Sequence, residues 1–198
     1  LDRIRYYKKH PVRRAYRICR RIGGKVYRKI KPILKKILPP TMYYKKLVIP
    51  RVESPMVSIV IPVYNEFDYT YQCIASIISN VKDVSYEIII GDDESKDTTR
   101  KIKKIIKNLK VNINHSDHGF LMNCNRAAKL AEGKYIVFLN NDTLVKEEWL
   151  ESLVNLIESD DKIGLVGSKL VYPDGRLQEA GGIVWKDATA WNYGRYQD

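Results

Sequence analysis

The sequence predicts an α/β fold, with a mostly parallel sheet covered by helices on both faces. One observation predicts the fold class, and a second predicts where the domain begins. From residue 56 onward, short apolar runs alternate with amphipathic stretches, and strands that alternate with helices need crossover connections, which make the strands parallel. Residues 1–50 are different: they hold 17 Lys and Arg and a single acid, whereas residues 51–198 hold 18 bases and 22 acids. We therefore expect a basic helical segment at 1–55 and one α/β domain at 56–198.

The strands are predicted from short runs of apolar, largely β-branched residues. The first run ends at Pro62, and the run at 134–139 has no polar residue after Lys134, so we expect a strand buried on both faces. The predicted strands are 56–62, 86–90, 111–114, 134–139 and 163–171.

The helices are predicted from apolar residues at helical spacing. Asp68 or Asn65 can cap the first helix, and Gly133 can stop the third. The predicted helices are 69–79, a lysine-rich helix with Ile102, Ile105, Ile106 and Leu109 on one face, 123–133 and 146–159.

Polar clusters follow four of the strands. They read PVYNE, GDDES, HSDHG and NND in chain order. Any one of them is equally well explained as a cap or a turn, and His115 and His118 suit a surface or capping role. Because the ligand site of a parallel sheet lies off the carboxyl ends of its strands, four such clusters predict a site at that edge.

Carboxylates and amides at this edge suit a hard divalent cation, Mg²⁺ or Mn²⁺, with Asp142 as the first choice of ligand. The chain has neither GxxxxGK nor GxGxxG, which argues against the common triphosphate and dinucleotide sites. Three scattered cysteines without a CxxC pair indicate a reducing compartment, so we expect a cytoplasmic protein.

The basic segment has three interpretations. Its apolar stripe and its Lys and Arg suit the surface of an anionic membrane, which would place the protein peripherally at the inner face of the cell membrane. It equally suits a linker or a contact with a partner domain. Nucleic-acid binding is the weakest interpretation, because no RNA- or DNA-binding motif accompanies the charge.

Four stretches in this order resemble the nucleotide-sugar-binding half of a family 2 glycosyltransferase. They are VSIVIPVYNEFDYTYQCIASI, YEIIIGDDESKDTT, GFLMNCNRAAKLAEGKYIVFLNNDT and LVGSKLVYPDGRLQEAGG. The resemblance covers about residues 56–185. It implies the A-type glycosyltransferase fold, with a Rossmann-like nucleotide-binding half, and inverting transfer of a sugar from a UDP- or dTDP-linked donor to a saccharide or lipid-linked acceptor in surface polysaccharide synthesis.

The resemblance also implies roles for single residues. The first motif, residues 62–66, wraps the nucleoside, and Asp92 of the aspartate pair accepts a hydrogen bond from the base. Arg126 approaches the nucleotide, where its guanidinium can pair with phosphate or simply face solvent. Glu94 stands where the family commonly has Gly. The nucleotide-binding residues implied in this way are Pro62, Val63, Tyr64, Asn65, Glu66, Asp92, Asp93, Asn125, Arg126, Asn140 and Asn141.

Asn140-Asn141-Asp142 falls on the family's DxD metal motif, with Asp142 at its last carboxylate. Asn140 departs from the motif by supplying a neutral oxygen, and this LNND form resembles the one in rhamnosyltransferase-like members. The resemblance places the catalytic base in an acceptor half beyond Asp198, so we assign no base and expect this chain alone to bind nucleotide without turnover.

Residues 173–182 resemble the segment that borders the donor sugar. Gly181 and Gly182 would allow close approach of the backbone to the sugar, whereas Asp174-Gly175 predicts a hairpin turn. Trp185, Trp191 and Tyr193 could stack on an acceptor or belong to a core. The alternative to an enzyme is a non-catalytic binding or scaffolding module, for which Asn140 and Glu94 would be evidence.

Overall fold

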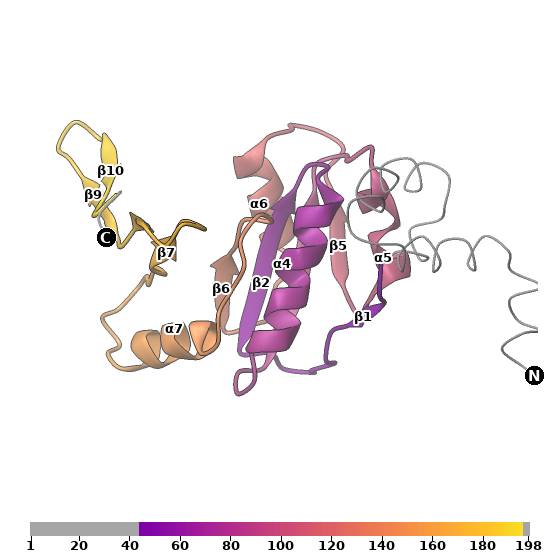
Figure 1. Ribbon diagram of the computed structural model, residues 1–198, viewed down its shortest axis with the longest axis horizontal. Helices are drawn as coiled ribbons and strands as arrows, with labels where there is room; N and C mark the ends of the chain where they lie inside the picture. The colour runs from indigo at the N-terminus through magenta and orange to yellow at the C-terminus, as the bar shows by residue number, and fades with distance from the viewer. Residues whose placement is uncertain (1–43, 196–198) are drawn as a thin grey trace, which may run out of the picture.

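A computed structural model describes residues 44–195, and its centre is a four-stranded parallel sheet (Figure 1). The strands lie in the order β5-β3-β2-β6, and all three pairings are parallel. The elements are β1 (Leu47–Val48), β2 (Val57–Val63), α4 (Phe67–Asn80), β3 (Tyr86–Asp92), the 3₁₀ helix η2 (Thr98–Lys101), α5 (Ile102–Ile105), β4 (Ile106–Lys107), β5 (Lys110–Ile113), α6 (Phe120–Ala128), β6 (Tyr135–Phe138), α7 (Trp149–Glu158), β7 (Leu170–Val171), β8 (Leu177–Glu179), β9 (Gly182–Val184) and β10 (Ala190–Asn192).

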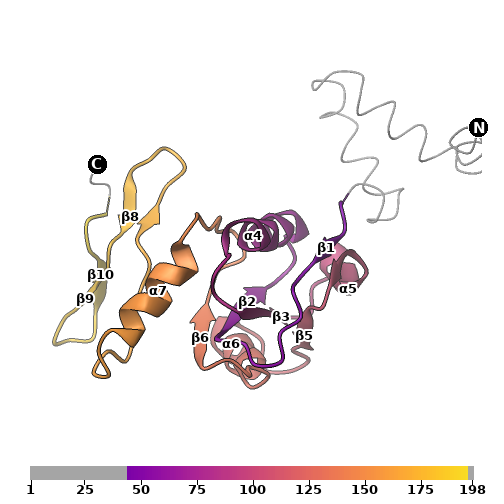
Figure 2. The same cartoon turned by 90° about the horizontal axis from the view of Figure 1, so that it is seen from below.

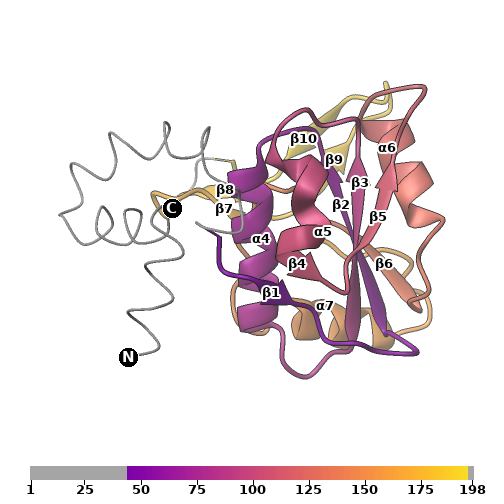
Figure 3. The same ribbon diagram turned by 90° about the vertical axis from the view of Figure 1, so that its right-hand side faces the viewer.

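Helices cover both faces of this sheet, as Figure 3 shows. On one face Ile59 and Ile61 of β2 and their neighbours on β3 pack against α4 and α5. On the other face Val60 and Ile89 pack against Ala127 of α6. The α/β class and the mostly parallel, Rossmann-like sheet are therefore confirmed. Central strands that alternate their apolar side chains between two covered faces read as continuous apolar runs, which is why the sequence showed them clearly.

Strand β6 differs from its prediction. Ile136 is 46% exposed and Phe138 is 53% exposed, so the expectation of burial on both faces is wrong. In the sheet β6 is an edge strand that pairs with β2, and α6 lies over β2, β3 and β5. Only the face that carries Tyr135 and Val137 packs on the core.

Two further elements are shorter than predicted. The lysine-rich helix ends at Ile105, and Ile106 already belongs to β4, although its four predicted apolar residues are all buried. Of the strand expected at 163–171, only Leu170–Val171 is a strand, and it pairs antiparallel with β8. The intervening turn places Gly175 at φ 93° and closes with a hydrogen bond from the backbone N–H of Tyr172 to Arg176 O at 2.8 Å, so the predicted Asp174-Gly175 hairpin turn is confirmed.

Gly133 has a different role from the predicted helix stop. Helix α6 ends at Ala128, five residues earlier. A Cβ atom at Gly133 would lie 2.5 Å from the backbone N of Ser58 and 2.8 Å from its Oγ. The backbone N–H of Gly133 donates to that same Oγ at 2.8 Å. This position therefore requires glycine because the turn before β6 touches the backbone of β2.

Residues 44–49 of the segment assigned to 1–55 pack on the α/β domain. Strand β1 pairs in parallel with β4, Ile49 is buried, and the Tyr44 ring meets the Phe67 ring edge-on with 4.8 Å between centroids. Residues 1–43 of this segment lie outside the described residues, and the membrane role of the segment stays a prediction. Within residues 44–195 no helix is long and apolar enough to cross a bilayer.

The last part of the chain extends away from the sheet beyond α7 (Figures 1 and 2). It forms two hairpins, β7–β8 and β9–β10. Leu150 of α7 is fully buried and belongs to the main core, whereas the side chains of Trp185, Trp191 and Tyr193 are exposed.

Candidate functional site

The register of the sheet brings the polar clusters to one edge. Val63 pairs with Asp92, and Asp92 pairs with Ile113, so the loops after β2, β3 and β5 start at one level. Phe138 pairs with Val60, which carries the turn at Asn140 to the same edge. Because β6 follows the other strands in the chain but lies on the far side of β2, the crevice between β2 and β6 is a topological switch point, where ligands of such sheets bind.

The loops after β2 and β3 are joined through Asn65. Its backbone N–H donates to Ser95 Oγ at 2.7 Å, and its Oδ1 accepts from the backbone N–H of Lys96 at 2.7 Å. Asn65 and Glu66 have left-handed backbones, with φ of 58° and 54°. Asn tolerates this conformation better than most residues. The first motif therefore ends in a tight turn, which the acidic turn beside it holds in place.

Helix α4 is capped from that neighbouring turn. Asp97 Oδ2 accepts from the backbone N–H of Phe67 at 3.0 Å, whereas neither Asp68 nor Asn65 caps the helix as predicted. The Asp68 carboxylate instead accepts a hydrogen bond from the Tyr44 hydroxyl. A cap that comes from about thirty residues away cannot be read from local sequence, since the N-cap pattern looks only at adjacent positions.

Asp92 lies at the end of β3 and is only 4% exposed. Its Oδ1 accepts from the backbone N–H of Ser95 at 2.9 Å, which fixes the carboxylate toward the turn. Glu94, two residues on, has φ 59°. Glycine adopts this conformation at no steric cost, whereas it is less favourable for a residue with a side chain such as Glu.

Asp93 holds the loop that follows β5. Its Oδ1 accepts from Asn114 Nδ2 at 2.7 Å and lies 2.9 Å from His118 Nδ1, and its Oδ2 accepts from the backbone N–H of Gly119 at 2.9 Å. Desolvation acts to raise the pKa of Asp93, but the hydrogen bonds from His118, Gly119 and Asn114 outweigh it and hold the pKa below its usual value. His118 is therefore hydrogen-bonded to the Asp93 carboxylate. In the same way His115 Nδ1 lies 2.9 Å from Glu94 Oε1.

The predicted helix residues Asn125 and Arg126 lie on α6, which directly follows this loop. Asn125 is exposed. The Arg126 guanidinium bonds to Asn114, to the carbonyl of Ser116 and, at 2.7 Å, to Asp117 Oδ2. Arg126 is thus an internal partner of the loop rather than a solvent-facing helix residue.

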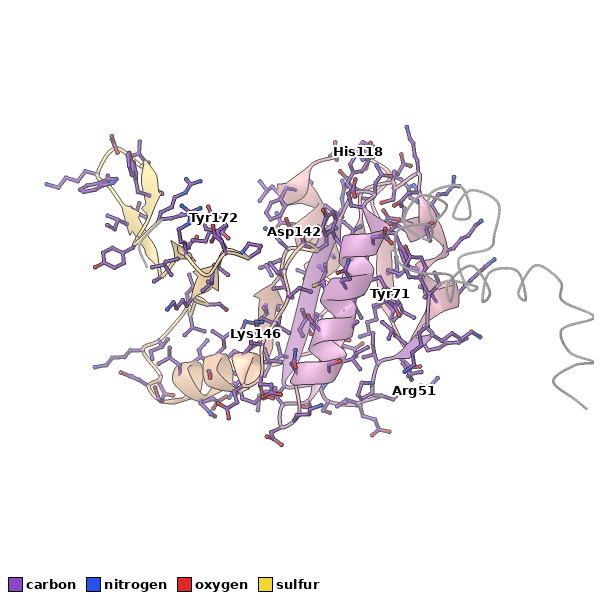
Figure 4. The ribbon with its side chains drawn as sticks, viewed as in Figure 1. Arg51, Tyr71, His118, Asp142, Lys146 and Tyr172 are labelled. Atoms are coloured by element: carbon purple, nitrogen blue, oxygen red, sulfur yellow. The ribbon has the colours of Figure 1, made fainter. Side chains whose placement is uncertain are left out.

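The turn after β6 is fastened to α4. Asn141 Nδ2 donates to Thr70 Oγ1 at 3.1 Å, and Thr143 Oγ1 donates to the carbonyl of Asn140 at 2.7 Å. Asn140 and Asp142 are exposed, and Figure 4 shows Asp142 on the β6 side of the sheet and His118 at its upper end. The thiol of Cys73 packs beneath the turn, where burial raises its pKa to about 12.

The turn at residues 140–142 has oxygen atoms that suit a metal ion. Across residues 44–195, no three His, Cys, Asp or Glu side chains gather closely enough to hold one by themselves. The turn offers the Asp142 carboxylate and two amide oxygens. Mg²⁺ is usually held by one or two carboxylates, with substrate phosphates and water completing its shell, so these residues fit a cation that arrives with a diphosphate.

Gly181 and Gly182 lie away from the sheet edge. Gly181 has φ 120°, and Gly182 begins β9 in the hairpin that extends past α7. A Cβ atom at either position would have no other atom within 4 Å. Their predicted contact with the donor sugar stays a prediction.

Sequence reasoning missed four site residues that act from inside the protein. Thr70 and Ser95 anchor two of the turns, and Asn114 joins Asp93 to Arg126. Asn123 is buried and donates from Nδ2 to the Gly91 carbonyl at 2.8 Å. For Thr70 and Asn123 the available signal was a polar residue on an otherwise apolar face of α4 or α6. Ser95 stands within the GDDES cluster, and Asn114 directly precedes HSDHG.

Residues 58–196 match the family described as glycosyl transferase family 2. The chain belongs to this family. The match starts at the second residue of β2 and includes every loop of the polar edge. The predicted family is thus confirmed, while the rhamnosyltransferase-like variant of the LNND motif stays a prediction.

Several known glycosyltransferases are similar to this family 2 chain. It is 32% identical over 120 residues to an uncharacterized glycosyltransferase of Haemophilus influenzae, covering 59% of this chain and 37% of that protein. It is 31% identical over 127 residues to the putative teichuronic acid biosynthesis glycosyltransferase TuaG of Bacillus subtilis, covering 62% and 50%. The crystal structure of TarS residues 1–349 from S. aureus aligns with a TM-score of 0.47 at 23% identity, covering 63% and 41%. The chain thus spans half or less of these proteins.

Proposed function

We propose that this domain binds the nucleotide diphosphate sugar of an inverting, metal-dependent hexosyltransferase. The observation that carries the proposal is the gathering of the loops after β2, β3, β5 and β6 at one edge of a parallel sheet, in a chain of glycosyl transferase family 2. In the whole protein the sugar passes to a saccharide or lipid-linked acceptor.

The nucleoside is proposed to lie against the ends of β2 and β3. Strand β2 ends at Val63, and the exposed Tyr64 leads into the left-handed turn at Asn65 and Glu66. Asp92 accepts a hydrogen bond from the base, because a buried carboxylate whose orientation is fixed by its own turn is preorganised to accept from one N–H donor. Asp93 supports the site by holding the neighbouring loop.

The diphosphate is proposed to lie against the end of β6. Asp142 would hold Mg²⁺ or Mn²⁺ together with the phosphate oxygens, while the amides of Asn140 and Asn141 line the turn. When bound, the cation would offset the negative charge of the leaving group. Because Asn140 carries no charge, we expect weaker binding of the free cation than a pair of carboxylates would give.

The acceptor side is proposed to belong to the remainder of the protein. Inversion needs a general base on the face of the sugar opposite the diphosphate, and we place that base beyond Asp198. Gly181 and Gly182 are proposed to border the donor sugar. TuaG is described as a teichuronic acid biosynthesis enzyme, which supports a role in surface polysaccharide synthesis. The proposed location is cytoplasmic, with residues 1–50 at an anionic membrane surface.

The test is calorimetric titration of this chain with UDP and with dTDP, each with and without Mn²⁺. We expect one of them to bind far more tightly with Mn²⁺ than without it, and Asp142→Ala to remove that gain. Asp161→Ala, which removes an exposed carboxylate from the loop after α7, is the matched control and should bind as the unaltered chain does. An affinity that does not change with Mn²⁺, or no binding in folded protein, would favour the non-catalytic scaffolding module.

A further inference from the structure

The Arg126 side chain is committed to the loop between β5 and α6. One guanidinium nitrogen donates to Asn114 Oδ1 and to the Ser116 carbonyl, and the other pairs with Asp117 Oδ2 at 2.7 Å. The side chain is 26% exposed. A planar guanidinium that meets three acceptors at once is held in one orientation.

Asn114 carries this contact to the acidic turn. It is 1% exposed, its Nδ2 donates to Asp93 Oδ1 at 2.7 Å, and its backbone N–H donates to the Asp92 carbonyl at 2.8 Å. At the other end of the loop, the backbone N–H of Gly119 donates to Asp93 Oδ2. Residues 114–119 are therefore fixed beside Asp92 by hydrogen bonds to Asp93 and to Arg126.

The strand order separates this loop from the proposed metal ligand. The loop follows β5, the outer strand on one side of the sheet, and Asp142 follows β6, the outer strand on the opposite side. Three strand spacings of ~4.8 Å put roughly 14 Å between the two edge strands. The end of β6, where Asp142 would hold a diphosphate, is thus separated from the loop that Arg126 bonds, whereas a base held at Asp92 lies next to that loop.

We propose that Arg126 is a positioning residue for the nucleoside and does not bind phosphate. It fixes residues 114–119 as the wall of the nucleoside site, and Asn114 and Asp117 transmit its effect. This inference rests on the proposed function, because it assumes that a nucleotide binds at the Asp92 side of the edge.

The experiment compares Arg126→Ala with the unaltered chain for three ligands that differ in their phosphates: uridine, UMP and UDP, each with the diamagnetic Mg²⁺, or the thymidine series if dTDP is the nucleotide that binds. Dissociation constants are measured by NMR titration. We expect Arg126→Ala to raise all three by a similar factor, about tenfold, as for one lost charge-assisted hydrogen bond. A loss of affinity that is absent for the nucleoside and grows with each phosphate would overturn the inference and leave the proposed function unaffected.

Asp117→Asn gives an independent test that keeps Arg126 in place. If Asp117 steadies Arg126, the variant weakens binding of all three ligands. If Asp117 instead competes with phosphate for the guanidinium, the variant tightens UDP binding and overturns the inference. Lys129→Ala, which removes an exposed cation just after α6, is the charge control and should change nothing. If no nucleotide binds the unaltered, folded chain, the proposed function is wrong, and the inference that rests on it is wrong as well.

Discussion

Asn141 and Thr70 join the turn after β6 to the first turns of α4. The Nδ2 of Asn141 donates to Oγ1 of Thr70 at 3.1 Å, although the two residues are 71 positions apart. Thr70 is fully buried. The contact fixes the peptide that precedes Asp142, so the orientation of the proposed metal ligand depends on a hydroxyl inside the core.

Thr70→Val is expected to lower the free energy of unfolding by about 1 kcal/mol and to weaken Mn²⁺-dependent nucleotide binding several-fold, because it removes the acceptor and keeps the shape. Thr99→Val is the matched control: Thr99 is equally buried, and its Oγ1 has no hydrogen-bond partner in the described part of the chain. Chemical denaturation and calorimetry measure the two effects. Equal behaviour of both variants would show that the Asn141 contact does not position the turn.

Gly133→Ala is expected to destabilise the domain by about 2 kcal/mol or more, because a methyl group there would press on the backbone of Ser58. Thermal unfolding checks this. The control is Gly164→Ala, at a position where an added Cβ meets no atom within 4 Å. A melting temperature of Gly133→Ala close to that of the control would mean that the chain relaxes away from Ser58.

Glu94→Gly is expected to raise the free energy of unfolding by up to about 1 kcal/mol, because φ 59° costs a side-chain-bearing residue more than it costs glycine. Glu147→Gly, at an exposed position outside the left-handed region, is expected to be destabilising instead. Denaturant titration of both variants gives the comparison. A loss of stability in Glu94→Gly would show that its contact with His115 outweighs the backbone strain.

The stability of the domain is expected to depend on Asp93 at acid pH. Its folded-state pKa lies below the usual value of 3.8, so the carboxylate stabilises the fold above that pH, and this contribution is lost as pH falls through the folded pKa. Asp93→Asn should therefore unfold more easily than the unaltered chain at pH 7, and the difference should shrink below about pH 3.8. A difference that stays constant from pH 7 to pH 3 would contradict the assignment.

The sequence was most informative where one local pattern was enough. The apolar runs of β2 and β3 and the amphipathic residues of α4 predicted a parallel sheet with covered faces, and the four polar clusters predicted its functional edge. It was least informative at β6, because an apolar run looks the same at the edge of a sheet as at its centre.

Residue types and their order determined the α/β class, the family and the identity of the polar edge, because hydrophobic periodicity and short motifs are properties of neighbouring positions. The strand order and the partners of each polar side chain were decided by the tertiary structure. Asp97 caps α4, Thr70 holds Asn141, and Arg126 binds the loop after β5. These contacts join residues from different loops and helices, and only the packing of helices against the sheet brings them within hydrogen-bonding distance.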